Sequence, residues 1–141
     1  IDFIVVTEDI TLPEDIANLK ISNPDISRYD CYATFSINGE KKNCTMILYA
    51  NKEYTTGTFF QYLRVGFMAL DSNLKAIQEN GKTVIYEMHE VSDFFEKVGK
   101  NTQYIIHPEE IMADNFSFAL MDKKELPTPE LIKAIQEKLR E

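Results

Sequence analysis

The dipeptide Asn38-Gly39 constrains the fold of this chain more than any other feature of its sequence. It separates two segments, residues 31–37 and 43–49, that are rich in β-branched and aromatic side chains. Asn and Gly accept the positive φ angles that both central positions of a tight hairpin turn require. We therefore predict an antiparallel β-hairpin whose turn is centred on these two residues.

Outside the hairpin, local patterns predict a short strand and several helices. Residues 2–7 are rich in β-branched and aromatic types, which favours a strand. Apolar residues recur at helical spacing in five other segments. These are a short one near residues 14–19, a buried helix from Thr55 or Thr56 to about Asp71, a helix over residues 91–98 that Gly99 can end, a helix from Pro108 to about Met121, and an amphipathic helix that starts at Thr128 and Pro129.

This order of elements predicts an α+β fold. A small antiparallel sheet containing the hairpin is expected to pack against four to five helices on one side. The length of 141 residues suits one domain over residues 1–141, and no repeat or linker divides it.

Composition excludes several classes of function. The chain has 15 basic and 23 acidic residues and a net charge of −8, which argues against nucleic-acid binding. No stretch is apolar over the roughly 20 residues that a membrane span needs. Two cysteines are too few for a disulfide scaffold. In the predicted hairpin register Cys44 faces Ala33 and not Cys31, so a disulfide within the hairpin is not favoured. The two cysteines therefore favour a reducing, cytoplasmic location. Ile1 in place of Met indicates a processed or truncated chain.

The segment from His107 to Phe116 carries the clearest chemical signal. On a helix, Glu110 and Asp114 lie on one stripe with apolar residues on either side. A partly buried carboxylate needs a metal ion, another cation or hydrogen-bond donors. The plainer interpretation is a solvated acidic face at a helix start, with His107 as a capping or core residue.

The residues Glu110-Ile111-Met112-Ala113-Asp114 form an ExxAD motif that resembles the gluzincin metallopeptidases, and the surrounding segment looks like short bacterial zincin-type proteins. In that family an HExxH helix supplies two zinc-binding histidines and a catalytic glutamate. The resemblance implies that Glu110 is the third zinc ligand, and that Asp114 supports a histidine ligand. Zinc with three protein ligands keeps a fourth position for water, which the glutamate deprotonates.

The matching HExxH helix is missing from this sequence. The best alignment with the buried helix places the two histidines at Val65 and Ala69 and the glutamate at Gly66. A second alignment uses Gln61, Tyr62 and Val65, and neither offers zinc a ligand. The resemblance thus implies a zincin-like frame whose zinc helix is degenerate, with no cofactor expected. His89 could rescue a zinc site, because His89 and Asp93 would share one helical face with Glu90 as the base.

Three functions follow from these observations. The first is a zincin-like domain that has lost its zinc ligands and binds a peptide or protein partner, with an exposed hairpin edge that can add a strand and tyrosines that serve as anchors. The alternative is an active zinc metallopeptidase with a non-standard site at His89 and Glu110. The second alternative is an unrelated small interaction module.

Overall fold

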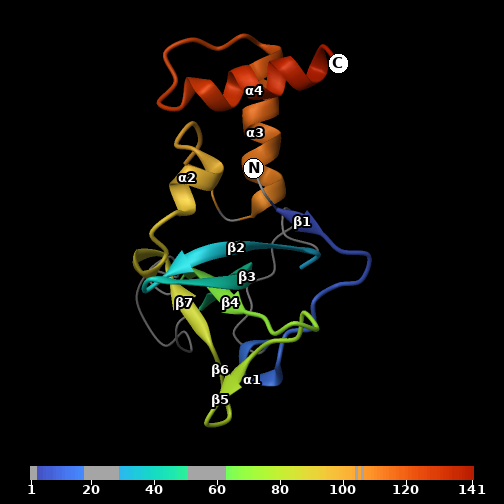
Figure 1. The fold of residues 1–141 in the computed structure, drawn as a ribbon, viewed down its shortest axis with the longest axis vertical. Coiled ribbons are helices and arrows are strands. Elements are labelled where there is room, and N and C mark those ends of the chain that lie inside the picture. Colours follow the sequence, from blue (N-terminus) through green and yellow to red (C-terminus); the bar gives the residue numbers. More distant parts are fainter. Residues whose placement is uncertain (1–2, 18–28, 51–62, 104, 106) are drawn as a thin grey trace.

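The computed structural model describes residues 3–17, 29–50, 63–103, 105 and 107–141. They form the mixed α+β fold expected from the sequence (Figure 1). The main sheet has five antiparallel strands in the order β1-β2-β3-β4-β7. Its outermost strands are β1 (Ile4–Val5) and β7 (Ile85–Glu87), and a separate pair is formed by β5 (Gln78–Glu79) and β6 (Lys82–Thr83).

The hairpin prediction is confirmed in its strands, its turn and its register. Strands β2 (Cys31–Ile37) and β3 (Glu40–Ala50) pair with Ala33 opposite Cys44. Asn38 and Gly39 both have positive φ, at 50° and 82°. Cys31 and Cys44 are buried free thiols, as the register requires.

Four of the predicted helical segments are helices in the structure. They are α1 (Glu14–Ala17), α2 (Phe94–Val98), α3 (Pro108–Leu120) and α4 (Pro129–Leu139), and a 3-10 helix η2 (Met88–Glu90) precedes α2. Gly99 ends α2 with a φ of 74°. Figure 1 shows α3 rising away from the sheet and α4 crossing its far end. No helix in the described part of the chain is both long and apolar enough to cross a membrane.

The predicted buried helix is wrong over Leu63–Ala69, which form strand β4. This strand pairs with β3 on one side, where Gly66 faces Ile47, and with β7 on the other, where Gly66 faces Glu87. Its position inside the sheet explains the misleading pattern. A strand buried on both faces is a nearly continuous apolar run, which periodicity alone does not separate from a buried helix. Residues 51–62 lie outside the described part.

Two hydrophobic cores hold the sheet, one on each face. The first lies between the sheet and helices α2 and α3, where Phe35, Phe67 and Phe94 form successive edge-to-face contacts at 5.1 and 5.6 Å between ring centroids. The second lies against the N-terminal segment and includes Ile10 and Ile16. Because Ile16 belongs to α1, this short helix covers the opposite face of the sheet from α2 and α3, so the predicted packing of all helices on one side is wrong.

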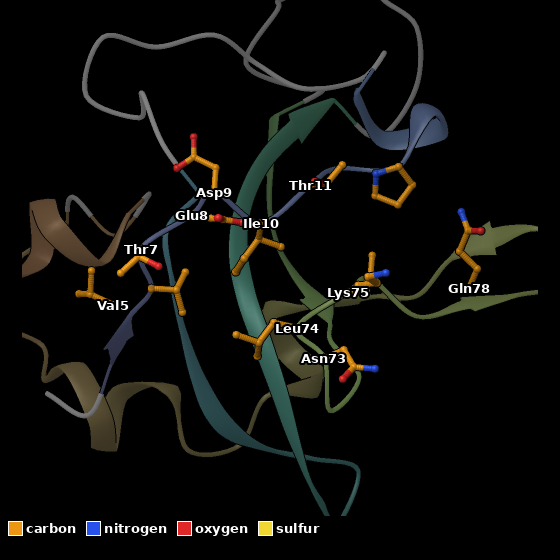
Figure 2. Close-up of a pocket in the computed structure, with 13 residues that line it drawn as sticks. Val5, Thr7, Glu8, Asp9, Ile10, Thr11, Asn73, Leu74, Lys75 and Gln78 are labelled. Atoms are coloured by element: carbon orange, nitrogen blue, oxygen red, sulfur yellow. The ribbon is translucent and has the colours of Figure 1, made fainter.

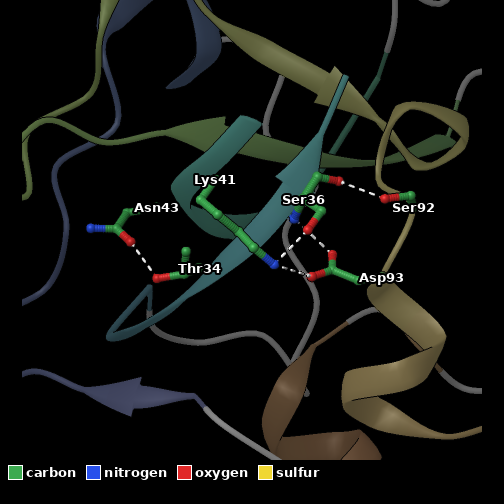
Figure 3. Close-up of polar contacts among 6 residues, drawn as sticks. All are labelled: Thr34, Ser36, Lys41, Asn43, Ser92 and Asp93. Carbon is green, nitrogen blue, oxygen red and sulfur yellow. Dashed lines mark hydrogen bonds and ion pairs between the residues drawn. The ribbon is translucent and has the colours of Figure 1, made fainter. Parts of the chain in front are cut away.

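The expected free edge of the hairpin is wrong. Strand β3 is paired on both sides, and β2 pairs with β1 at Cys31 and Tyr32. Further along β2, the Ser36 amide donates to the Asp93 carboxylate at 2.8 Å, and the Ser36 carbonyl accepts from the Ser92 hydroxyl at 3.3 Å (Figure 3). The same carbonyl also accepts from the Ser92 amide at 3.0 Å. Of the nearby tyrosines, Tyr29 is buried in the second core, and Tyr32 and Tyr49 are partly buried against it, which disfavours a role as surface anchors. Tyr54 and Tyr62 lie outside the described residues.

Candidate functional site

Three potential metal ligands converge where strand β2 starts beside the start of helix α3. Asp30 precedes β2, Cys31 is its first residue, and His107 is the residue before Pro108 that caps α3. All three residues are buried, and one ligand atom from each lies within 4.8 Å of the others. We call this group the Asp30–Cys31–His107 cluster.

Backbone contacts fix the β2 side of the cluster. The Asp30 carbonyl accepts a hydrogen bond from the Val6 amide at 2.7 Å. Cys31 pairs with Val5 across β1 and β2, and its carbonyl accepts from the Thr45 hydroxyl at 2.8 Å. Asp30 and Cys31 are therefore held by the sheet itself.

A helix cap fixes the histidine side of the cluster. The backbone of His107 is extended, and its Nδ1 accepts from the Glu109 amide at 3.1 Å. This is the capping role that the sequence predicts for a histidine before a proline-started helix. The cap satisfies one of the amides that a helix start leaves without an intrahelical partner.

The chemistry of the cluster suits a metal ion better than nucleophilic catalysis. Burial, together with the negative charges of Asp30 and Glu109, raises the pKa of the Cys31 thiol to about 12. The thiolate, not the thiol, is the reactive nucleophile, so Cys31 is not activated at neutral pH. A carboxylate, a thiolate and an imidazole are nonetheless three of the ligand types that proteins use for transition metals, so the cluster can hold a metal ion.

An apolar groove runs beside the cluster, between β1 and the first half of α3. It has a volume of about 390 Å³. Its walls are mainly apolar and come from both elements: Phe3, Val5, Cys31, Pro108, Glu109, Met112, Ala113 and Phe116. Cys31 belongs to both the cluster and the groove wall.

A second, larger hollow lies along the segment that continues from β1. It has a volume of about 840 Å³ and separates residues 5–13 from the loop at residues 73–78. Figure 2 shows the side chains of these two segments facing each other across it. Val5 lines both the groove and this hollow and is 71% exposed. The groove and this hollow thus meet at Val5.

Glu110 and Asp114 lie on α3 as predicted, one turn apart and half-buried. The Thr102 hydroxyl donates to the Asp114 carboxylate, so this carboxylate has a neutral partner on the segment before α3. Neither residue belongs to the convergent ligand group found among the described residues. Their assignment as zinc ligand and supporting residue stays a prediction.

The predicted helical face shared by His89 and Asp93 is wrong. His89 lies in the 3-10 helix η2, and Val91 is extended before α2 begins. The His89 side chain is 75% exposed and pairs with the Glu87 carboxylate at 3.3 Å. Asp93 is buried and bonded to β2 instead, while the Glu90 carboxylate accepts from the Glu87 amide at 2.8 Å.

The positions that align with the HExxH motif lie on a strand and not on a helix. Val65, Gly66 and Ala69 all lie on β4, so the alignment that gave them a helical spacing is wrong. Successive strand residues point to opposite faces, which separates Val65 from Gly66. In the second alignment, Gln61 and Tyr62 lie outside the described residues.

Sequence reasoning missed Asp30 and Cys31 as site residues. The hairpin register relates Cys31 only to the strand that carries Cys44, and no local spacing links Cys31 to His107, which is far away in the chain. The available signal was the β-branched segment at residues 2–7. Its pairing with β2 places Cys31 beside the start of α3.

No family model, curated protein or solved structure matches this chain. The resemblance to gluzincins therefore stays a prediction.

Proposed function

We propose that this chain is a non-catalytic binding domain that holds an extended peptide segment of a partner along β1, in the groove beside α3. The observation that carries the proposal is the apolar groove between an outermost strand and a helix. Such a groove suits strand addition, in which main-chain hydrogen bonds give affinity and side-chain pockets give specificity.

Strand β1 supports this mode by its position and exposure. It is the last strand of the sheet, and no described strand pairs with its outer edge. Ile4 and Val5 are exposed apolar residues on it. Because side chains of an added strand alternate in direction, a peptide beside Val5 can direct successive residues towards the groove and towards the hollow, both of which Val5 lines.

Helix α3 supplies the opposite wall and indicates the chemistry of the peptide. Met112 and Phe116 are exposed apolar residues one turn apart, and both line the groove. Glu109 lines it as well, and the whole chain carries a net charge of −8. The expected ligand is an extended apolar segment flanked by Lys or Arg, because opposite charges assist encounter and selectivity.

The test is selection of peptides from a random library displayed against the 141-residue chain, followed by affinity measurement with the selected peptide. Phe116→Glu should weaken binding by about tenfold or more, as for a central apolar anchor. The matched control is Leu120→Glu, an exposed apolar residue of the same helix that does not line the groove. This control should leave the affinity within about twofold, as substitutions outside the energetically dominant contacts do.

A backbone readout separates strand addition from simple apolar contact. Methylation of alternate peptide nitrogens removes donors that an added strand needs while keeping the side chains. One of the two alternating methylation patterns should abolish binding. Equal affinity of both methylated peptides, or equal losses in Phe116→Glu and Leu120→Glu, would exclude the proposed mode.

The zincin-like ancestry of this binding domain remains part of the proposal, and a catalytic zinc at His89 and Glu110 belongs only to the metallopeptidase alternative. That alternative requires His89 and Glu110 to hold one ion. It predicts chelator-sensitive peptide hydrolysis that is lost in Glu110→Gln. Hydrolysis unchanged by this substitution would eliminate it.

A further inference from the structure

We propose that Asp30, Cys31 and His107 form a zinc-binding site beside the groove. These residues are not the ones that the ExxAD motif indicates, and the inference does not depend on peptide binding. It rests on three different ligand types brought within 4.8 Å by two elements that are distant in the sequence.

The spacing of the three ligand atoms fits zinc. Zinc bonds of roughly 2.0–2.3 Å in a tetrahedral site place neighbouring ligand atoms about 3.3–3.8 Å apart. The three ligand atoms already lie within 4.8 Å of one another. Side-chain rotations that move them by about an ångström can therefore complete the site. The backbone contacts of Asp30 and Cys31 hold the main chain in place while this occurs.

The ligand types select zinc over the hard divalent cations. Magnesium and calcium prefer sites made of oxygen atoms, whereas sulfur and imidazole nitrogen favour zinc and related metals. Burial favours a bound divalent cation in general, because it offsets the charges of the buried carboxylate and of the thiolate that forms on binding. When zinc binds, a Zn–S bond forms at Cys31 and the thiol proton leaves to solvent, so one proton is released for each ion bound at this ligand.

His107 has to exchange one contact for another when zinc binds. Its Nδ1 now accepts from the Glu109 amide. Zinc at Nδ1 would replace that contact, and zinc at Nε2 would require Nδ1 to carry a proton and hence to stop accepting. Either geometry breaks the cap at the Glu109 amide, which gives this site a signature that a surface zinc ion would lack.

The groove determines what can complete the coordination. Cys31, Pro108 and Glu109 line it, so the cluster borders the groove and is otherwise buried. A fourth ligand can come from the Glu109 carboxylate or from water in the groove. Three protein ligands with an accessible fourth position are the pattern of zinc sites that also contact a bound molecule.

Cobalt(II) titration of the reduced 141-residue chain tests the site, because a cobalt–thiolate bond produces a charge-transfer absorption that reports a cysteine ligand. Wild-type protein should take up one equivalent with this absorption, and zinc should displace it. Cys31→Ser should abolish the absorption, whereas Cys44→Ala, which removes the other buried thiol, should retain it. His107→Gln should weaken zinc binding by more than about 100-fold, beyond the loss typical of outer-shell partners.

A second measurement avoids dependence on variants that fold poorly. Zinc titration followed by amide NMR of the wild-type protein should shift the resonances of Cys31, His107 and Glu109 together at one equivalent. His89→Gln and Glu110→Gln should leave the zinc affinity unchanged. Absence of the cobalt–thiolate absorption, its retention in Cys31→Ser, or an unshifted Glu109 amide at saturation would overturn the proposal.

Discussion

The ring of Tyr49 lies against the backbone of Gly66, where it leaves no space for a side chain. A Cβ atom at Gly66 would lie 2.7 Å from Tyr49 Cε1 and 2.6 Å from Ile85 Cγ2. We therefore predict that Gly66→Ala lowers the free energy of unfolding by about 1–3 kcal/mol, the usual range for overpacking. Urea unfolding of the two proteins measures the difference.

The Ile85→Ala background provides the control for this prediction, because it removes the nearest atom that the new methyl group would meet. The cost of Gly66→Ala should be smaller there than in the wild type. An equal cost in both backgrounds would contradict the steric explanation. The same crowding at Gly66 means that introducing histidine, glutamate and histidine at Val65, Gly66 and Ala69 should unfold the sheet. Such a variant therefore cannot test metal binding.

The hairpin and the helices at Pro108 and Pro129 could be predicted because their signals are local. Asn38-Gly39 selects a turn and thereby a register. Prolines at the start of a helix fit because their missing amide would have no intrahelical partner. Strand β4 could not be predicted, because burial on both faces removes the alternation that identifies a strand.

The candidate site was less accessible to sequence reasoning than the fold. The capping role of His107 follows from its place before Pro108, but its proximity to Cys31 depends on how β2 sits beside α3. The ExxAD motif predicts Glu110 as a metal ligand, whereas the residue that joins the ligand cluster is His107, three positions earlier. Only the tertiary arrangement shows which of these two residues lies beside Cys31.

Asp93 connects helix α2 to strand β2, and removing its carboxylate should destabilise the fold. Its Oδ1 accepts from the Ser36 amide at 2.8 Å, and Lys41 lies 3.6 Å from its Oδ2 (Figure 3). Asp93→Ala leaves the partly buried Ser36 amide without this acceptor, which should cost about 1 kcal/mol, the lower end of the range for a buried donor. Asp93→Asn keeps an acceptor oxygen and should cost less. Urea unfolding at pH 7 compares the variants.

The same contacts predict an acid-dependent loss of stability. Burial raises the pKa of Asp93, but hydrogen bonds from Ser36 and the charges of Lys97 and Lys41 outweigh it, so the pKa is below its ordinary value of 3.8. A carboxyl group with a lowered native pKa stabilises the fold above pH 3.8, and this contribution is lost as the pH falls through the native value. Wild type should therefore lose its advantage over Asp93→Asn in acid. Parallel acid profiles of wild type and Asp93→Asn would contradict this explanation.

Asn101 and Asn115 connect the segment before α3 to both C-terminal helices. The Asn101 amide group donates to Asn115 Oδ1 at 2.9 Å and to the Thr128 carbonyl at 2.8 Å, and its oxygen accepts from the Thr128 amide at 2.7 Å. We predict that Asn101→Asp, which has the same shape but no side-chain donors, costs about 1–3 kcal/mol. Hydrogen exchange should speed up at α4 more than at β3. Uniform acceleration across the chain would argue against a local connecting role.

The buried thiol of Cys44 should make the protein lose stability in alkali. Burial raises the pKa of Cys44 from 9.0 to about 12, with a smaller opposing effect of the Lys42 charge. A group whose native pKa is raised contributes stability that is fully present below its unfolded pKa. As the pH rises above 9, the unfolded thiol ionises while the native thiol stays protonated, and the free energy of unfolding falls until about pH 12.

Cys44→Ala removes this contribution, so its stability should fall less steeply than that of wild type between pH 8.5 and 10.5, a window of about two units that brackets the rise in thiolate fraction. Urea unfolding under reducing conditions measures both slopes. Tyr29 and Tyr49 also have raised pKa values from burial and remain in both proteins, so only the difference between the slopes reports on Cys44. Parallel slopes would contradict the prediction. They would mean that Cys44 ionises equally in the native and unfolded states despite its complete burial beneath α2 and α3.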